Sequence, residues 1–234
     1  IMKKILLNSL LFLFTFNFLC SQTYIKNDAY EVMYSQAFQQ PITIAYEYPD
    51  FKTPYLVQKV LAVKKITNEV SYPDPVQTKT SINWTVPENI VTSDKDDYSS
   101  PYDRGHLAPA ASFTNDEQQK FIYSYLNCAI MHKALNRGVW KTLENREREL
   151  SYTNKVRVKI ILSFSNKNSL ADGGANIPTS FTKIIEYGKT YFKPLGKKYE
   201  ITREVYSFPN NESVKNTDLD SYKVKSLSGK FSIN

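Results

Sequence analysis

The chain has 234 residues, of which 41% are hydrophobic and 23% are charged, and this composition excludes an intrinsically disordered protein. Its 17 Tyr and 13 Phe, against only 7 Gly, favour β-strands over a helical bundle. The net charge of +7 suits an anionic partner such as nucleic acid or a membrane surface, but it says nothing about the fold.

The N-terminal segment has the order of a secretory signal: Lys3 and Lys4, an apolar run over residues 5–19, and then Cys20-Ser21-Gln22. The apolar run is shorter than the about 20 residues that a membrane span needs. We predict a signal over residues 1–21, cleaved after Ser21, and a secreted or periplasmic protein. Lipid attachment at Cys20 is a less favoured alternative because the bulky Leu19 is a poor neighbour for cleavage, and an uncleaved anchor ranks third. No stable membrane partner is expected.

Removal of that signal would leave Cys128 as the single cysteine, so neither an internal disulfide nor a thiolate zinc site is expected.

The remaining residues, 22–234, show no linker or internal repeat and are predicted to form one domain. Hydrophobic periodicity and turn residues give the expected elements in chain order. Strands are predicted over 30–38, 40–49, 55–66, 155–164, 180–192 and 200–210, a short strand around Trp84 within the loop 67–100, and helices over 115–126 and 138–152. Strands at both ends with helices grouped between them indicate an α+β fold.

The stretch Asp103-Arg104-Gly105-His106 combines groups that phosphate chemistry uses. Arg104 carries a planar fork of donors that matches two phosphate oxygens, and Gly105 lets the flanking side chains be aimed independently. A nearby cation lowers the pKa of an imidazole, which suits a base that takes a proton from water. The alternative is a surface loop in which Asp103 pairs with Arg104 and His106 has no role.

A second run of polar residues follows, with Asn127, Asn136, Trp140, Glu144 and Arg148 spaced as N-x8-N-x3-W-x3-E-x3-R. Glu144 and Arg148 are four apart and share a helix face, where they could also form an ordinary solvated pair. An amide oxygen is a weak ligand for zinc but is acceptable for Mg²⁺, which keeps most of its waters. A carboxylate such as Glu144 could then hold one of those waters.

The DRGH motif followed by LAPA, together with this second run, resembles the DNA/RNA non-specific endonuclease family, which includes the Serratia-type nucleases and endonuclease G. The resemblance extends from Tyr30 to Phe231 through NIPTSFTKIIEY, YSFPN and LDSYKVKSLSGKF. It implies a ββα-metal (His-Me finger) site on an α+β domain with a central antiparallel sheet. It also implies a metal-dependent hydrolase that cleaves phosphodiester bonds of DNA and RNA without sequence specificity, and the N-terminal signal predicts that this enzyme is secreted.

By the resemblance, the matched positions receive roles. His106 corresponds to the general base, Asn136 to the sole protein ligand of a hydrated Mg²⁺ (with Mn²⁺ as an alternative ion), and Glu144 to the carboxylate that orients water on the metal. Arg148 and Arg104 match phosphate-contacting arginines, Asn127 an asparagine that lines the site, and Asp103 the residue that fixes the loop.

The chain also departs from the family pattern, because Ile130-Met131 stands where the family usually has Pro-Gln. Loss of a polar neighbour at Met131 would lower activity or alter substrate preference. It motivates the alternative of a weakened relative that only binds nucleic acid, and a third reading is a structural lipoprotein tethered through Cys20. His132 is expected to be a packed or solvated residue rather than a ligand. Oligomeric state and any inhibitor protein stay open.

Overall fold

The computed structural model describes residues 22–48, 86–87, 89–113, 115–165, 169–193, 196–214 and 218–233. The predicted signal over 1–21, the predicted strand over 55–66 and the predicted short strand around Trp84 lie outside the described residues. None of the helices in the described part of the chain is long and apolar enough to cross a membrane.

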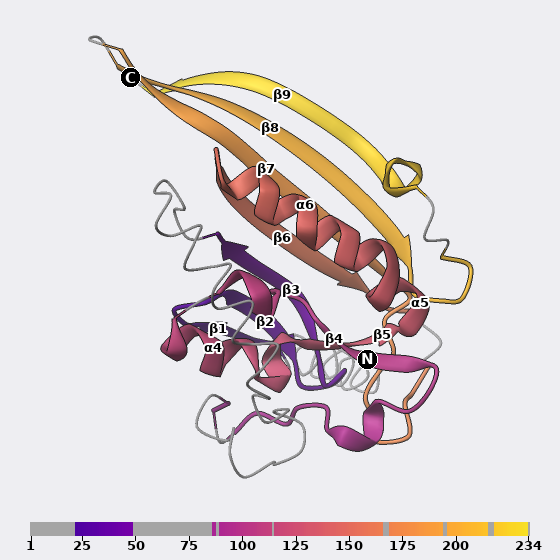
Figure 1. Cartoon of the computed structure of the whole chain (residues 1–234). Helices are drawn as coiled ribbons and strands as arrows, with labels where there is room; N and C mark the ends of the chain where they lie inside the picture. The colour runs from indigo at the N-terminus through magenta and orange to yellow at the C-terminus, as the bar shows by residue number, and fades with distance from the viewer. Residues whose placement is uncertain are drawn as a thin grey trace, which may run out of the picture.

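A seven-stranded antiparallel sheet forms the body of the molecule, with the strand order β1-β2-β3-β6-β7-β8-β9 (Figure 1). Its strands are β1 (Gln22–Lys26), β2 (Glu31–Ser35), β3 (Gln40–Glu47), β6 (Lys155–Ser163), β7 (Ser180–Lys193), β8 (Gly196–Pro209) and β9 (Lys223–Ile233). Five of the predicted strands are confirmed, because β2, β3, β6, β7 and β8 each fall within or overlap a predicted range, whereas β1 and β9 were not predicted. In β6 the alternation of exposed and buried residues is complete, as expected of a strand with one face on the core.

A second, two-stranded sheet carries the DRGH motif and is followed by the main helix, so the predicted ββα order is present. Strand β4 (Tyr102–His106) pairs antiparallel with β5 (Cys128–His132). After β5 come the short helix α5 (Lys133–Leu135), a wide helical turn over Asn136–Trp140, and α6 (Lys141–Ser151). The predicted helix start near Gly138 is five residues late, and the chain breaks its helical geometry at Gly138 instead (φ −102°, ψ −120°).

The predicted helix over 115–126 is present only in its first half. Helix α4 spans Asp116–Ile122, and its predicted cap is confirmed because Asn115 accepts a hydrogen bond from the Glu117 amide at 2.8 Å. The chain then turns through a short 3₁₀ segment, Tyr125–Asn127, directly into β5. Further single 3₁₀ turns lie at Lys95–Asp97, Ala110–Ser112 and Leu219–Tyr222.

Two side-chain amides join the small sheet to the large one. Gln40 of β3 accepts a hydrogen bond from the Ile130 amide at 3.1 Å. Asn210, just after β8, accepts from the His132 amide at 2.7 Å and donates to the Ile130 carbonyl at 2.9 Å. These bonds satisfy the free edge of β5, which would otherwise be a buried row of unpaired backbone groups. The DRGH strand is therefore held rigidly against the body of the protein.

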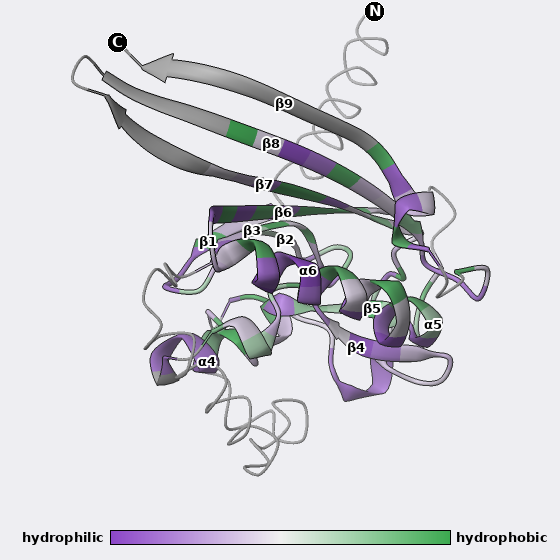
Figure 2. Ribbon diagram, turned by 45° about the horizontal axis from the view of Figure 1, so that its top comes forward, coloured by the Kyte–Doolittle hydropathy of each residue, from purple (hydrophilic) through white to green (hydrophobic). Residues whose placement is uncertain are grey.

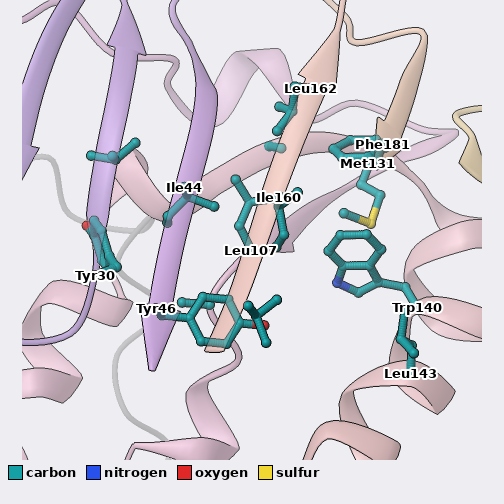
Figure 3. Close-up of a cluster of buried hydrophobic side chains, with 14 of the residues drawn as sticks. Tyr30, Ile44, Tyr46, Leu107, Met131, Trp140, Leu143, Ile160, Leu162 and Phe181 are labelled. Atoms are coloured by element: carbon teal, nitrogen blue, oxygen red, sulfur yellow. The ribbon is translucent and has the colours of Figure 1, made fainter. Parts of the chain in front are cut away.

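The core lies between the large sheet and the layer formed by the small sheet and α6 (Figure 3). Phe181 of β7 packs edge-on against Trp140, Leu143 follows on α6, and Ile160 and Leu162 of β6 belong to the same core cluster (Figure 3). Each of these side chains is buried. Helix α6 packs through this apolar stripe, and hydrophilic and hydrophobic residues are mixed along its ribbon (Figure 2).

An ionic cluster fastens α6 to the sheet on one side. Glu204 of β8 accepts two hydrogen bonds from Arg146, at 2.8 and 3.1 Å, and others from Lys223 and Tyr206. Burial alone would raise the pKa of Glu204, but the hydrogen bonds from Arg146, Lys223 and Tyr206 outweigh it and lower that pKa to about 2. The helix that bears Asn136, Glu144 and Arg148 is thus fixed in rotation as well as in position.

Candidate active site

His106 ends strand β4, opposite Cys128 of β5. Its ring packs edge-on against Tyr123, with the ring centroids 5.4 Å apart, and its main-chain carbonyl accepts a hydrogen bond from the indole of Trp140 at 3.3 Å. Arg104 lies two residues earlier on the same strand, so it projects from the same face as His106. The strand therefore carries one cation and one imidazole on the same face.

Position 105 requires glycine because the Met131 side chain fills the space that a side chain at this position would occupy. A methyl group at Gly105 would come within 2.7 Å of the Met131 Cβ on the paired strand. Met131 itself is fully buried and lies beside Trp140 (Figure 3). The residue that replaces the family's usual Gln is therefore a packing residue under the motif.

Asn127 lies next to the segment that follows His106, and its side chain is engaged by the backbone. Its side chain is fully buried, accepts a hydrogen bond from the Ala108 amide at 2.8 Å, and donates to the carbonyls of Ala108 and Ile122, both at 2.9 Å. All three bonds go to the backbone, so Asn127 holds the segment that follows His106. Substrate contact by Asn127 stays a prediction.

Asp103 joins the motif strand to the helical segment. Its carboxylate accepts a hydrogen bond from the Asn136 amide nitrogen at 3.1 Å and two from Arg137, at 2.6 and 2.8 Å. The hydrogen bond from Arg137 lowers the pKa of Asp103, and the hydrogen bond from Asn136 lowers it further. Partial burial acts in the opposite direction but is the weaker effect. The ionised carboxylate therefore orients the Asn136 amide, with its nitrogen toward Asp103 and its oxygen directed elsewhere. The pairing of Asp103 with Arg104, weighed from the sequence, is replaced by a pairing with Arg137.

Glu144 lies one turn after Trp140 on α6, in a mixed electrostatic environment. Burial raises its pKa to about 7, although the charges of Lys183 and Arg148 and a hydrogen bond from Trp140 act in the opposite direction. Glu147 next to it adds to the rise. Trp140, one turn before Glu144, donates its indole N–H to the His106 carbonyl, so the helical segment meets the end of the motif strand there.

This pKa predicts that Glu144 costs stability at neutral pH. Below about pH 4.5 the carboxyl is protonated in both the folded and the unfolded chain and costs nothing. As pH rises from there to the folded pKa near 7, the unfolded chain ionises first and stability falls. We expect Glu144→Gln to unfold at a higher temperature than wild type at pH 8 in EDTA, by at most about 3 kcal/mol in unfolding free energy, and to show little difference at pH 4.5.

Thermal unfolding at the two pH values measures this effect. Glu149→Gln removes an exposed carboxylate from the same helix and serves as the control. A stability difference between Glu144→Gln and wild type that does not change with pH would contradict the assignment.

Arg148 extends from the next turn of α6. It donates to the Ser112 hydroxyl at 3.3 Å and to the side chain of Asn145. Arg148 therefore bonds to these polar partners instead of forming the solvated pair with Glu144 that the sequence also allowed. Its positive charge still acts on Glu144 and partly offsets the rise of the Glu144 pKa.

Sequence reasoning missed a group of buried polar residues beneath the site. Glu147 of α6 is fully buried and accepts hydrogen bonds from Lys183, Tyr46 and Tyr48. The sequence around Glu147 does not indicate that this residue is buried, because Glu147 lies in a run of charged residues. The only sequence sign was Lys183, a charged residue at an inward position of the strand SFTKIIEY.

His132 is a packed residue, as expected. It is 6% exposed, its ring lies edge-on to Tyr102, and its side chain caps α5 by accepting a hydrogen bond from the Ala134 amide at 3.2 Å.

The donor set fits a hydrated Mg²⁺. Within the described ranges, no three His, Cys, Asp or Glu side chains are grouped to hold a metal ion. Asn136 is half-buried, and its amide nitrogen is engaged by Asp103, so its oxygen is the end that can bind a cation. Amide and carboxylate oxygens are the ligands that Mg²⁺ takes, and Mg²⁺ needs few of them.

Comparisons with known proteins agree with this geometry. One solved structure, the crystal structure of a complex of EndoG with EndoGI that addresses the mechanism of EndoG inhibition, has a similar fold. The TM-score is 0.58 at 18% identity, over 86% of this chain and 80% of the other. No curated protein matches the chain. The family model of the DNA/RNA non-specific endonucleases matches residues 11–229. Since that match spans nearly the whole sequence and the fold is the α+β, ββα-metal type, the chain belongs to the DNA/RNA non-specific endonuclease family.

Proposed function

We propose that this protein is a Mg²⁺-dependent endonuclease that hydrolyses phosphodiester bonds of DNA and RNA without sequence specificity. The observation that carries the proposal is the joining of the motif strand to the helix. Asp103 bonds to Asn136, and Trp140 bonds to the main chain of His106 one turn before Glu144. The general base and the ion-holding residues therefore belong to one rigid unit.

In the proposed reaction, His106 takes a proton from the attacking water, whose oxygen forms the new bond to phosphorus. The bond to the 3′-oxygen breaks at the same time, and this oxygen takes up a proton from solvent water. Asn136 would hold the ion through its amide oxygen, and Glu144 would orient water on it. When bound, Mg²⁺ supplies positive charge that offsets the charge developing at the scissile phosphate. Arg148 and Arg104 stabilise the same negative charge through their guanidinium donors.

Contacts of this kind hold phosphates and do not read bases, so both DNA and RNA are expected substrates. The binding constant on duplex DNA should then fall with salt, log K dropping by roughly 0.9 per log unit of salt for each phosphate contact. Fluorescence anisotropy of a labelled duplex in Ca²⁺, over a range of KCl, measures the slope. A flat salt dependence, or product ends of fixed sequence, would count against the phosphate-only recognition.

The function is tested by nicking of supercoiled plasmid and degradation of a structured RNA with Mg²⁺, with Mn²⁺ and with EDTA. The proposal expects cleavage of both nucleic acids with either ion and none in EDTA. If the folded protein retards DNA on a gel but cleaves neither nucleic acid with either ion, it is the binding module instead.

We also propose that the protein is exported through a signal over residues 1–21. The charged and apolar order of that segment supports this. Mass spectrometry of the mature protein should find Gln22 at its N-terminus, whereas a lipid-modified Cys20 would indicate an anchored protein. The complex of EndoG with EndoGI makes an inhibitor protein the class of partner to search for.

A further inference from the structure

A directed chain of hydrogen bonds runs from Arg148 into the core. The Arg148 guanidinium donates to the Ser112 hydroxyl at 3.3 Å. Ser112 donates to the Tyr48 hydroxyl at 3.2 Å, and Tyr48 donates to the Glu147 carboxylate at 2.9 Å. Each hydroxyl accepts one bond and donates one, so the chain has a single direction and ends on an anion.

The anion at the end of this chain is held by a buried cation. Glu147 and Lys183 are both 0% exposed, and the Lys183 ammonium donates to the carboxylate at 2.8 Å. The same ammonium lies 3.8 Å from the ring centroid of Trp140. A buried ion pair adds little net stability, because the cost of removing two charges from water offsets their attraction. Fixing the direction of neighbouring polar groups is a use that such a pair can serve.

Two tyrosines contact the same oxygen of Glu147, but only one of them leads to the active site. Tyr46 donates at 2.8 Å and Tyr48 at 2.9 Å. Both are buried, at 3% and 7% exposure, yet only the Tyr48 hydroxyl also accepts from Ser112. The two hydroxyls therefore support Glu147 alike and differ in their connection to Arg148.

We propose that Tyr48 and Ser112 are positioning residues that aim the Arg148 guanidinium at the scissile phosphate. This inference rests on the proposed function of Arg148. With the Tyr48 hydroxyl in place, the Ser112 proton is directed inward and the oxygen lone pairs face Arg148. Without it, Ser112 can rotate and donate elsewhere, and the guanidinium loses one of its two anchors, the other being Asn145. A pre-aimed cation costs no reorganisation as charge develops on the phosphate.

The test compares Tyr48→Phe with Tyr46→Phe in the full chain. Each variant removes one hydroxyl from the same carboxylate oxygen, so both should lower the melting temperature by similar amounts. Single-turnover cleavage of a labelled duplex in Mg²⁺ should be about fivefold to tenfold slower for Tyr48→Phe, the fold-change that one lost hydrogen bond supplies. Tyr46→Phe should cleave within about twofold of wild type on the same scale.

A second measurement separates positioning from a general loss of structure. In an Arg148→Ala background, Tyr48→Phe should slow cleavage by less than about twofold, because the residue it acts through is gone. Ser112→Ala should slow cleavage as much as Tyr48→Phe does, both in the wild-type protein and in the Arg148→Ala background. It removes fewer atoms from the core, so it replaces Tyr48→Phe in this test if that variant folds poorly.

Equal slowing by Tyr48→Phe and Tyr46→Phe would overturn the inference. So would an undiminished effect of Tyr48→Phe or Ser112→Ala in the Arg148→Ala background. If the wild-type protein does not cleave, the proposed function has failed, and that outcome is visible before any variant is compared.

Discussion

His106→Ala should cleave DNA at least about a hundredfold more slowly than wild type while binding it almost as tightly. A positioned general base contributes about 10² to 10⁴ in rate. The imidazole should add little to the binding of phosphate, because Arg104, Arg148 and the ion are the groups proposed to hold the anion. Single-turnover cleavage in Mg²⁺, with binding measured separately in Ca²⁺, resolves the two effects.

The second histidine of the chain provides the matched control. His132 caps α5 and packs on Tyr102, and Asn is also a favourable cap. His132→Asn should therefore cleave within about threefold of wild type, a difference of about 0.6 kcal/mol in activation free energy. A parallel loss of binding and cleavage in His106→Ala would mean that His106 contacts the phosphate instead of acting as the base.

Asn136→Ala should raise the Mg²⁺ concentration for half-maximal cleavage by at least about tenfold, since loss of even an outer partner of a metal site costs that much. The amide that Asp103 orients, whose oxygen is the proposed ligand, would be absent. The fold should persist, because Asn136 is half-buried and outside the hydrophobic core. A titration of cleavage rate against Mg²⁺, with circular dichroism of each variant, measures both results.

Arg137→Ala is the control for Asn136→Ala. It removes the exposed partner of Asp103 but leaves the Asn136 amide in place. An exposed ion pair contributes little free energy. We therefore expect the Mg²⁺ concentration for half-maximal cleavage to stay within about threefold of the wild-type value. An unchanged Mg²⁺ requirement in Asn136→Ala would rule out this residue as the ligand.

Local alternation predicted five strands of the large sheet, whereas β1, β4, β5 and β9 were not predicted and the order of the site elements came from the family resemblance. Alternation along Lys155–Ser163 marks a half-buried strand, and Asn115 marks a helix start. The break at Gly138 within a helix that begins at Lys133 was not predicted, since it depends on how the segment leaves β5. Local patterns fix the type of element better than its ends.

The site was predicted less completely, because several of its contacts join distant parts of the chain. Asp103 meets Arg137 rather than its neighbour Arg104, and Asn127 turns its amide to the backbone of Ala108. Glu147 and Lys183 meet only after β7 packs beneath α6. A residue type can suggest chemistry, but tertiary packing decides whether the side chain faces substrate or core.

The central claim is that His106 is the base of a metal-dependent hydrolytic site. It is tested most directly by single-turnover cleavage of a labelled duplex by His106→Ala, with and without added imidazole. We predict that free imidazole restores part of the lost rate in His106→Ala and none in Asn136→Ala, because only the former lacks a proton acceptor. Cleavage by His106→Ala within about threefold of wild type, or equal stimulation of both variants by imidazole, would contradict the account.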